Sequence, residues 1–444
     1  MSSFDKVQEK LQKTATIIQG NKYVSAITNG LISALPVTIV GALGSLVNTL
    51  PIDAYQRFLE TSGLKSITGV PTMVTTNLLS LYVVFLIAAK FADGHKLDGT
   101  PAGLLALMAF LIITPLGNTT TSITTFLTTN KISLPDGVEP SGGDFLPLDW
   151  LGAAGLFTAF IVALLSAQLY VIFKEKGWGI KMPAGVPPTV SKSFSSLVPG
   201  VVLAVIAATI RFLMSLTAFE HLHAAIFAII ATPLKSLGGS IWAMVIAILV
   251  SHILWICGVH GSLVIYSVFA GIWVPMQMEN LSAFNSGQAI PNMVSMSLFG
   301  MVGFMGSGAT VGLAVAMLRA KSEQYRTLGR IAIIPNLCGI NEPLIFGLPI
   351  IMNFTLAIPF IVMPLLILLG SFIGMATGIL PYLTGVAAPL GTPVLLSGLL
   401  LGGWKWLVFQ VLMLVISYFM YLPFFKVTDK IAYQSEMEAA REQE

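Results

Sequence analysis

The sequence predicts an all-α polytopic membrane protein with about ten transmembrane helices and two re-entrant hairpins. The chain has 444 residues, of which 55% are hydrophobic and only 10% charged, and its mean hydropathy is +0.86. A soluble domain carries roughly 25% charged residues, so this chain has too few to cover a surface in water. Because a spanning helix needs ~20 apolar residues, the apolar half of the chain supports on the order of ten crossings.

The N-terminal segment, residues 1–22, differs from the apolar runs that follow it. Its charged residues alternate with Phe4, Val7, Leu11 and Ile18, which recur at helical spacing. The segment has neither the apolar core nor the small-residue cleavage site of a signal peptide. We therefore expect a retained amphipathic helix that lies on the membrane surface.

Residues 23–219 contain apolar runs long enough to span the bilayer. These runs lie at about 24–50, 72–89, 101–117, 147–173 and 197–219. Lysines before the first run, after the second run and in the loop at 174–192 place these segments in the cytoplasm, whereas the acidic loop 118–146 belongs outside. The pattern predicts a domain of five spans, with the N-terminus in the cytoplasm.

The second half, residues 220–425, gives a less regular count. Its longer apolar runs lie at about 240–268, 294–318, 350–380 and 404–425. By this count the segment Arg319–Arg330 would lie outside the cell. Because this segment is basic, it belongs in the cytoplasm, so one crossing is missing between it and residue 219. Either 221–234 or the apolar stretch through Trp273 contains that passage. The charged tail 426–444 fits a cytoplasmic C-terminus.

Two apolar segments in this half, 331–349 and 382–400, are short and interrupted by Gly and Pro. Such a pair is the best sequence indicator of hairpins that enter the membrane, turn back and line a substrate cavity. We therefore expect residues 220–425 to form a transport domain, with the substrate bound near these hairpins.

Glu342 is the sharpest candidate for chemistry, because it is a carboxylate within the apolar segment 331–349. At membrane depth a carboxylate is costly unless it has a partner or faces a polar cavity, so it marks a functional site by default. Pro343 suits the first position of a helix and Asn341 or Glu342 the cap before it, which would aim the helix N-terminus at the substrate. The alternative is that Glu342 only caps its own helix.

A second candidate group surrounds His260, in the segment from His252 to Gly261. Gly258 and Gly261 leave room beside His260, which can both donate and accept a hydrogen bond and so suits a sugar hydroxyl. His252 lies near the same helix face, and Trp255 could stack on a sugar ring. The alternative for each histidine is a hydrogen-bonded packing residue.

Several other kinds of site are not expected. Glu220, His221 and His223 resemble a metal cluster, but the remaining ligands are missing, and Cys257 and Cys338 are expected to be packing residues. The sequence has no nucleotide-binding fingerprint, and its net charge of +3 does not suggest nucleic-acid binding. We expect no metal and no cofactor, so the energy for transport must come from a gradient or a partner.

The segments LGRIAIIPNLCGINEPLIFGLPI, CGVHG and MPAGVPPTVSKSF resemble the IIC permease subunit of the bacterial phosphoenolpyruvate-dependent sugar phosphotransferase system, in its lactose/cellobiose/diacetylchitobiose family. The resemblance runs over nearly the whole chain. It implies ten spans and a homodimer whose interface lies in residues 23–219. It also implies that the C-terminal half carries a β-linked disaccharide across the plasma membrane by an elevator motion.

For the site, the resemblance implies that Glu342 and His260 bind the sugar and act in catalysis. Asn341, Trp255 and His252 are further candidates for sugar binding, from the residues themselves. The 6-hydroxyl of the sugar would be presented to a separate cytoplasmic IIB protein, itself phosphorylated through IIA. No IIA or IIB domain is expected within this chain, which would then be one subunit of a sugar phosphotransferase. The competing reading from the residues is an ion- or proton-coupled secondary sugar transporter, in which no phosphoryl transfer occurs.

Overall fold

The computed structural model of the protein describes residues 20–49, 53–129, 140–180, 194–348, 353–388 and 391–442, with a few isolated residues between them. Regular structure in these ranges is helical except for two short strands, β1 (Gly117–Asn118) and β2 (Asp144–Phe145), which pair antiparallel. This confirms the all-α polytopic class. The surface helix expected at 1–22 lies almost wholly outside the described residues.

The described chain packs as two compact units. The first, here called the N-terminal unit, comprises residues 29–37 and 71–233, and the second, the C-terminal unit, comprises the described parts of the remainder. Helices α2 (Lys22–Ser33) and α3 (Leu35–Thr49) contribute residues to both units. The functional division at 219 and 220 into a dimerisation and a transport domain stays a prediction.

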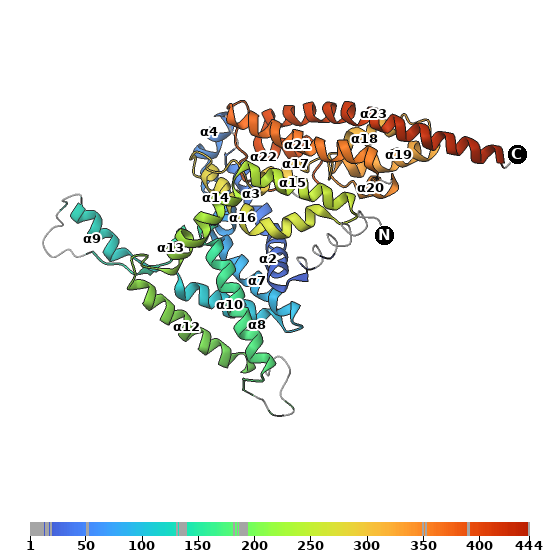
Figure 1. Ribbon diagram of the computed structural model, residues 1–444. Helices are drawn as coiled ribbons and strands as arrows, with labels where there is room; N and C mark the ends of the chain where they lie inside the picture. Colours follow the sequence, from blue (N-terminus) through green and yellow to red (C-terminus); the bar gives the residue numbers. More distant parts are fainter. Residues whose placement is uncertain are drawn as a thin grey trace. The chain divides into compact units, whose positions relative to one another are not determined.

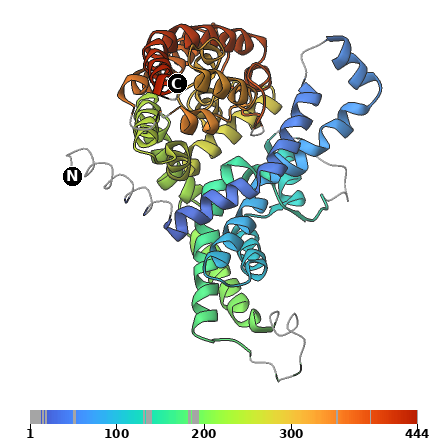
Figure 2. The same ribbon diagram turned by 90° about the vertical axis from the view of Figure 1, so that its right-hand side faces the viewer.

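The N-terminal unit is built around three long helices that pack on one another, α7, α8 and α10 (Figures 1 and 2). The elements of this unit that follow the first two helices are α6 (Val70–Thr75), η1 (Thr76–Leu78), α7 (Leu79–Gly94), α8 (Gly99–Ile113), β1, α9 (Thr119–Thr129), β2, η2 (Leu148–Trp150), η3 (Ala153–Gly155), α10 (Leu156–Glu175), α12 (Leu197–Ser215), α13 (Leu222–Ile226) and η4 (Phe227–Ala231). Small residues allow the close packing: a Cβ on Gly103 of α8 would lie 2.7 Å from the ring of Phe85 in α7.

The C-terminal unit holds one large apolar core, whose bulkiest buried side chains include Trp273, Trp406 and Phe360. Its helices are α4 (Asp53–Thr61), α5 (Leu64–Thr68), α14 (Thr232–Gly238), α15 (Ile241–Ile256), α16 (Gly261–Asn285), α17 (Met296–Val302), α18 (Val311–Met317), α19 (Glu323–Leu337), α20 (Glu342–Gly347), α21 (Phe354–Ala376), α22 (Leu396–Gly402) and α23 (Trp404–Glu442). The long helix α23 packs along α18, α21 and α22, as Figure 1 shows.

Seven helices in the described ranges are long and apolar enough to cross a membrane, and a bent pair, 222–238 with 241–256, adds an eighth candidate. The bend of 65° separates the two arms of this pair, and its first arm contains the segment 221–234 weighed above for the missing crossing. The count of ten spans is not confirmed.

Two of the expected uninterrupted runs are in fact broken. The run at 240–268 divides where α15 ends at Ile256 and His260 caps the start of α16, with Gly258 between them at φ 80°. The run at 294–318 divides into α17 and α18 around the turns of residues 303–310, here called the glycine loop. Hydropathy alone did not reveal these breaks, because glycine counts as neither polar nor charged and so does not interrupt an apolar run.

The two predicted hairpins differ from each other in form. At 331–349, α19 and α20 pack together and are joined by a turn at 338–341, where Gly339 has φ 76°. The described part of 382–400 begins as backbone without regular secondary structure, with Gly385 at φ 82°, and ends in α22. Both segments thus contain the irregular backbone expected beside a substrate path, and their re-entrant course through the membrane stays a prediction.

The glycine loop should tolerate no side chain at Gly308. This residue has φ 77°, and a Cβ there would lie 2.1 Å from the buried ring of Phe360. We expect Gly308→Ala to lower the free energy of unfolding by about 2 kcal/mol or more. Gly300→Ala is the matched control, because Gly300 lies in α17 and a Cβ there would have no neighbour within 4 Å. This substitution should be neutral or mildly stabilising. Thermal unfolding in detergent would measure both, and equal melting temperatures would contradict the packing described here.

Candidate functional site

The structure brings the two leading candidates together, although 82 positions separate them in the chain (342 − 260 = 82). His260 Nε2 lies 3.7 Å from Glu342 Oε1, and the two side chains are 36% and 43% exposed. His260 also caps α16, where its Nδ1 accepts a hydrogen bond of 3.3 Å from the backbone N–H of Leu263. Because Nδ1 accepts, a neutral ring carries its proton on Nε2, beside the carboxylate.

Glu342 is the first residue of α20 and Pro343 the second, so Pro343 lies one position later than the sequence predicted, and Asn341 takes the cap position without a side-chain cap hydrogen bond. Its Oε2 atom is buried and has no hydrogen-bond partner in the described part of the chain. Among these residues, no α20 amide donates a hydrogen bond to this carboxylate, so the geometry does not favour a mere capping role. A buried carboxylate oxygen without a donor is costly, and a ligand hydroxyl would supply the missing donor.

The glycine loop, residues 303–310, supports this pair and was missed by the sequence analysis. His252 connects it to α15: its Nδ1 lies 2.7 Å from Ile248 O, and its Nε2 accepts a 3.0 Å hydrogen bond from Gly308 N. The side chain of His252 is fully hydrogen-bonded and the residue only 5% exposed, which fits the packing alternative. Its direct contact with sugar stays a prediction.

Asn341, the residue before Glu342, is only 2% exposed and is bonded to the same loop. Its Nδ2 donates to Ser307 O at 2.6 Å and to Thr310 Oγ1 at 2.7 Å. The side chain also fills the space above Gly306, where a Cβ would lie 2.5 Å from Asn341 Cγ. Asn341 therefore fixes the turn that carries Glu342, while its own contact with sugar stays a prediction.

Trp255 lies behind His260, with ring centroids 4.3 Å apart, and is 3% exposed. Its Nε1 donates to Ser262 Oγ at 3.4 Å, and Ser262 Oγ lies 2.9 Å from Ser307 Oγ of the glycine loop. This burial gives Trp255 the position of a support for the imidazole. Its predicted stacking on sugar is untested.

Helix α23 holds the far side of the glycine loop. Tyr421 donates its hydroxyl to Gly308 O at 2.6 Å, and Ser417 Oγ donates to Ala309 O at 2.7 Å. The loop backbone is thereby hydrogen-bonded to α15, to α23 and to Asn341, the residue that precedes α20. Sequence offered one signal for it, the cluster Gly300, Gly303, Gly306 and Gly308 within an apolar run.

The other candidates do not form a metal site. The described residues hold no group of three or more His, Cys, Asp or Glu side chains that could bind a metal ion. His223 instead lies 3.1 Å from Thr114 Oγ1 and stacks on Trp150, while Cys257 is buried and Cys338 half-buried. Only packing roles are visible for this set.

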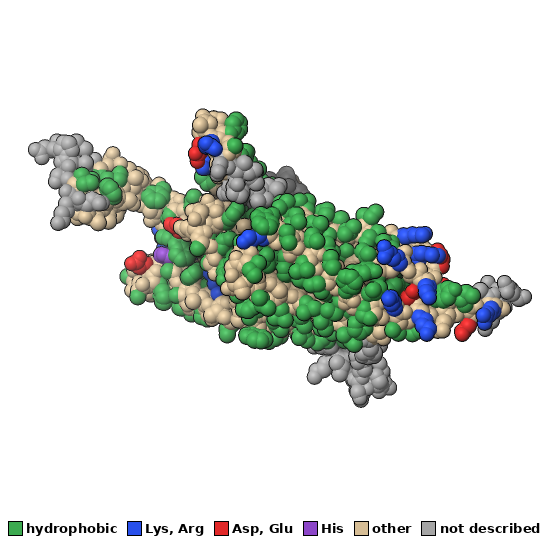
Figure 3. Space-filling view, turned by 90° about the horizontal axis from the view of Figure 1, so that it is seen from above, with side chains coloured by type: hydrophobic (Ala, Val, Ile, Leu, Met, Phe, Trp, Pro, Cys, Tyr) green, Lys and Arg blue, Asp and Glu red, His purple; other side chains and the backbone are tan. Residues whose placement is uncertain are grey.

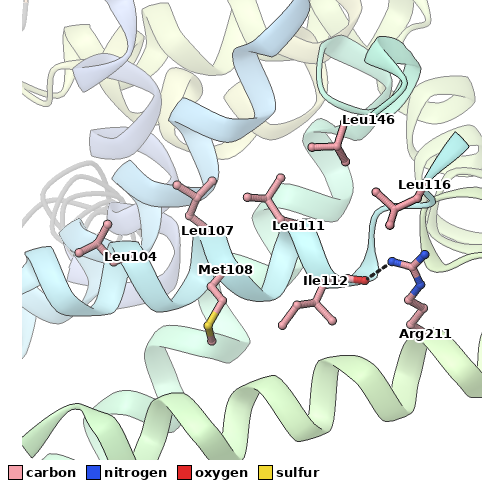
Figure 4. A pocket seen from close by; sticks show the side chains of 8 residues that line it. All are labelled: Leu104, Leu107, Met108, Leu111, Ile112, Leu116, Leu146 and Arg211. Carbon is pink, nitrogen blue, oxygen red and sulfur yellow. Dashed lines mark hydrogen bonds between the residues drawn. The ribbon is translucent and has the colours of Figure 1, made fainter. Parts of the chain in front are cut away.

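The N-terminal unit contains an apolar groove (Figure 4). Its lining is Leu104, Leu107, Met108, Leu111, Ile112, Leu116, Leu146 and Arg211. Arg211 already donates to two backbone carbonyls, those of Ile112 at 2.9 Å and Thr114 at 3.1 Å. The groove offers little to orient a sugar, because its polar contribution comes from one guanidinium.

Comparison with known proteins places these features in a family. Residues 28–364 match the sequence model described as "Phosphotransferase system, EIIC". The chain is 35% identical over 433 residues to the lichenan permease IIC component of Bacillus subtilis (strain 168), covering 96% of this chain and 93% of that one. It is 34% identical over 437 residues to the cellobiose-specific EIIC component of Geobacillus stearothermophilus, covering 96% and 94%.

A solved structure resembles the whole fold. The crystal structure of the transporter ChbC, the IIC component from the N,N'-diacetylchitobiose-specific phosphotransferase system, aligns with a TM-score of 0.87 and 32% identity. The alignment covers 97% of this chain and 99% of ChbC. The similarity therefore extends over both units of the chain.

Thr310 offers a test of the hydrogen-bond network that fixes Asn341. Its Oγ1 accepts from Asn341 Nδ2 at 2.7 Å and from Asn336 Nδ2 at 3.2 Å. Thr310→Val keeps the shape but leaves two buried amides without this acceptor, so we expect a loss of about 1–3 kcal/mol in stability. Thr310→Ser keeps the hydroxyl and should lose less. Equal melting temperatures for the two variants would contradict the network.

Proposed function

Because the chain belongs to the EIIC family of the phosphotransferase system, we propose that it carries a β-linked disaccharide of the cellobiose or diacetylchitobiose type across the bacterial plasma membrane. The family assignment makes it a sugar-specific IIC permease of this system. Relatives named for lichenan, cellobiose and diacetylchitobiose support a β-linked substrate. Both termini are proposed to lie in the cytoplasm, from the distribution of lysines.

The observation that carries the site proposal is the Oε2 atom of Glu342, which lies beside His260, is buried and has no hydrogen-bond partner among the residues that the structure describes. A sugar hydroxyl that donates to Oε2 satisfies it, and the Nε2–H of His260 can donate to an oxygen of the same sugar. Hydrogen bonds to charged acceptors are the stronger kind, so Glu342 dominates the binding. Trp255 and Asn341 then act by holding His260 and Glu342 in place.

The same two residues support our proposal for the phosphoryl step. The 6-hydroxyl of the bound sugar attacks the phosphoryl group carried by a separate IIB protein, the bond from that group to IIB breaks, and the sugar 6-phosphate forms. Phosphoryl transfer needs mainly positioning, and a carboxylate beside the attacking hydroxyl can accept its proton. Glu342 is placed for that role when the 6-hydroxyl is its ligand. IIB would be rephosphorylated through IIA.

For the domains we propose a homodimer whose interface lies in residues 23–219, with residues 220–425 moving as the transport element in an elevator motion. Helix α12 supports an interface in residues 23–219, because only 22% of its apolar spanning window is buried. Apolar side chains at Val201, Val205 and Phe212 contribute to that surface.

Replacement of the carboxylate should separate binding from folding. Glu342→Gln keeps the size but removes the anionic acceptor, so we expect sugar affinity to fall at least about tenfold and phosphorylation to be nearly lost. Glu60→Gln is the control, since Glu60 is an exposed carboxylate paired with Lys65. Isothermal titration with cellobiose and diacetylchitobiose, plus size-exclusion chromatography, would measure both variants. Normal binding by Glu342→Gln would refute the site assignment.

Cysteine crosslinking tests the proposed dimer interface. In a background without Cys257 and Cys338, single cysteines scanned along α12 should include positions that crosslink two copies in the membrane. Cysteines at Val408 and Phe419, which are exposed apolar positions of α23, should stay monomeric on denaturing gels. Crosslinks confined to α23 would reverse the assignment of the two domains.

The competing function, gradient-driven secondary transport, predicts a different energy requirement. Vesicles that contain the purified protein but no IIB protein should not accumulate sugar under an imposed proton or sodium gradient. They should produce sugar phosphate when phosphorylated IIB is supplied, even after an uncoupler collapses the membrane potential. Accumulation that needs the gradient and ignores IIB would establish the secondary transporter instead.

A further inference from the structure

One end of the C-terminal unit carries a group of exposed cations, visible as the blue side chains beside the end of α23 in Figure 3. The group, here called the basic patch, consists of the exposed side chains of Arg319 and Lys321, which precede α19, and of Lys426 and Lys430 in α23; Asp429 of α23 accepts from the amide of Lys321, which brings the two pairs together. In the described ranges, none of these four side chains forms an ion pair with an acidic residue. The patch thus presents positive charge outward.

The acidic side chains nearest to the patch in the sequence are engaged by the protein itself. Asp429 accepts from the backbone amides of Lys321 at 2.9 Å and Ser322 at 3.0 Å. Glu436 accepts from the amides of Glu323 at 3.0 Å and Gln324 at 3.2 Å, and from Ser322 Oγ at 2.6 Å. Two carboxylates of α23 therefore bind the N-terminus of α19, where the helix dipole favours negative charge. Their negative charge is therefore directed at backbone amides of the protein itself.

These bonds also give the patch a fixed shape. Helix α23 has 39 residues and is thus ~58 Å long, whereas the hydrocarbon core of a bilayer is ~30 Å thick. The polar part of α23 consequently extends beyond the membrane and is fastened to α19 there. Fixing the backbone that bears these cations lowers the conformational cost of binding a protein partner.

The patch is connected directly to the candidate site. Helix α19 begins beside Lys321 and runs to the turn at 338–341, which carries Asn341 and Glu342. A protein bound at the start of α19 thus holds the base of the hairpin that carries the carboxylate. A phosphoryl donor must approach with a negatively charged group, and a cationic surface attracts and orients it.

We propose that the basic patch is the docking surface for the phosphorylated IIB protein, which binds it through an acidic face around its phosphoryl group. This inference rests on the proposed phosphotransferase function. It assigns partner recognition to side chains that do not touch the sugar. Their removal should therefore weaken the encounter with IIB and leave sugar binding intact.

Charge reversal in neutral lipid tests the proposal. The two double variants are Lys426→Glu with Lys430→Glu and Arg319→Glu with Lys321→Glu, in nanodiscs of phosphatidylcholine. With a phosphorylated IIB protein of the cellobiose branch as donor, we expect the KM for IIB to rise about tenfold or more. In the wild type the KM should rise steeply with salt, and this dependence should flatten in the variants. Affinity for cellobiose should not change, which also shows that the variants are folded.

Lys405→Glu is the matched control, because Lys405 is an exposed lysine in the first turn of the same helix, outside the patch. It should leave the KM for IIB unchanged. An unchanged KM in both double variants would overturn the docking surface while the proposed function stands. A KM effect that appears only in vesicles of anionic phospholipid would assign the patch to lipid headgroups and overturn it as well. Absence of phosphoryl transfer by the wild type would instead overturn the proposed function.

Discussion

Within a membrane, backbone amides and carbonyls that leave a regular helix must find partners in the protein, because lipid offers none. In the glycine loop at 303–310, side chains from α15 and α23 and from Asn341, in the turn before α20, supply these partners. His252 accepts from Gly308 N, Tyr421 donates to Gly308 O, and Asn341 donates to Ser307 O. The candidate site depends on this arrangement, since Asn341 is also the residue that precedes Glu342.

The same constraint explains why the site can contain an unsatisfied atom. Asn341 Nδ2, Trp255 Nε1 and both ring nitrogens of His252 are hydrogen-bonded to protein groups, so these side chains fix the geometry around them. Glu342 Oε2 has no such partner among the described residues, and His260 keeps its Nε2 toward the carboxylate. A rigid surround with one open acceptor and one open donor is the arrangement expected for a pocket that selects a ligand by its hydroxyls.

Sequence reasoning reached the membrane class from apolar composition and singled out Glu342 as an intramembrane carboxylate. The family came from the resemblance of three sequence segments, and that resemblance implied that His260 and Glu342 meet at the sugar. Sequence reasoning did not reach the break at 303–310, where hydropathy stays high and only glycine spacing marks the turn. For Trp255 and His252, sequence reasoning also could not distinguish a residue that contacts the sugar from a residue that supports the site. That distinction depends on burial and on partners about 50 residues away, such as Ser307 and Gly308 (308 − 252 = 56).

The central claim is that Glu342 Oε2 and His260 Nε2 bind the disaccharide. A cryo-electron microscopy structure in lipid nanodiscs, determined with cellobiose and again with diacetylchitobiose, tests it most directly. The account predicts sugar density with one hydroxyl oxygen about 2.7 Å from Glu342 Oε2 and another oxygen near His260 Nε2. Sugar density elsewhere, for example in the apolar groove beside Arg211, with Glu342 bonded only to protein groups, would contradict it.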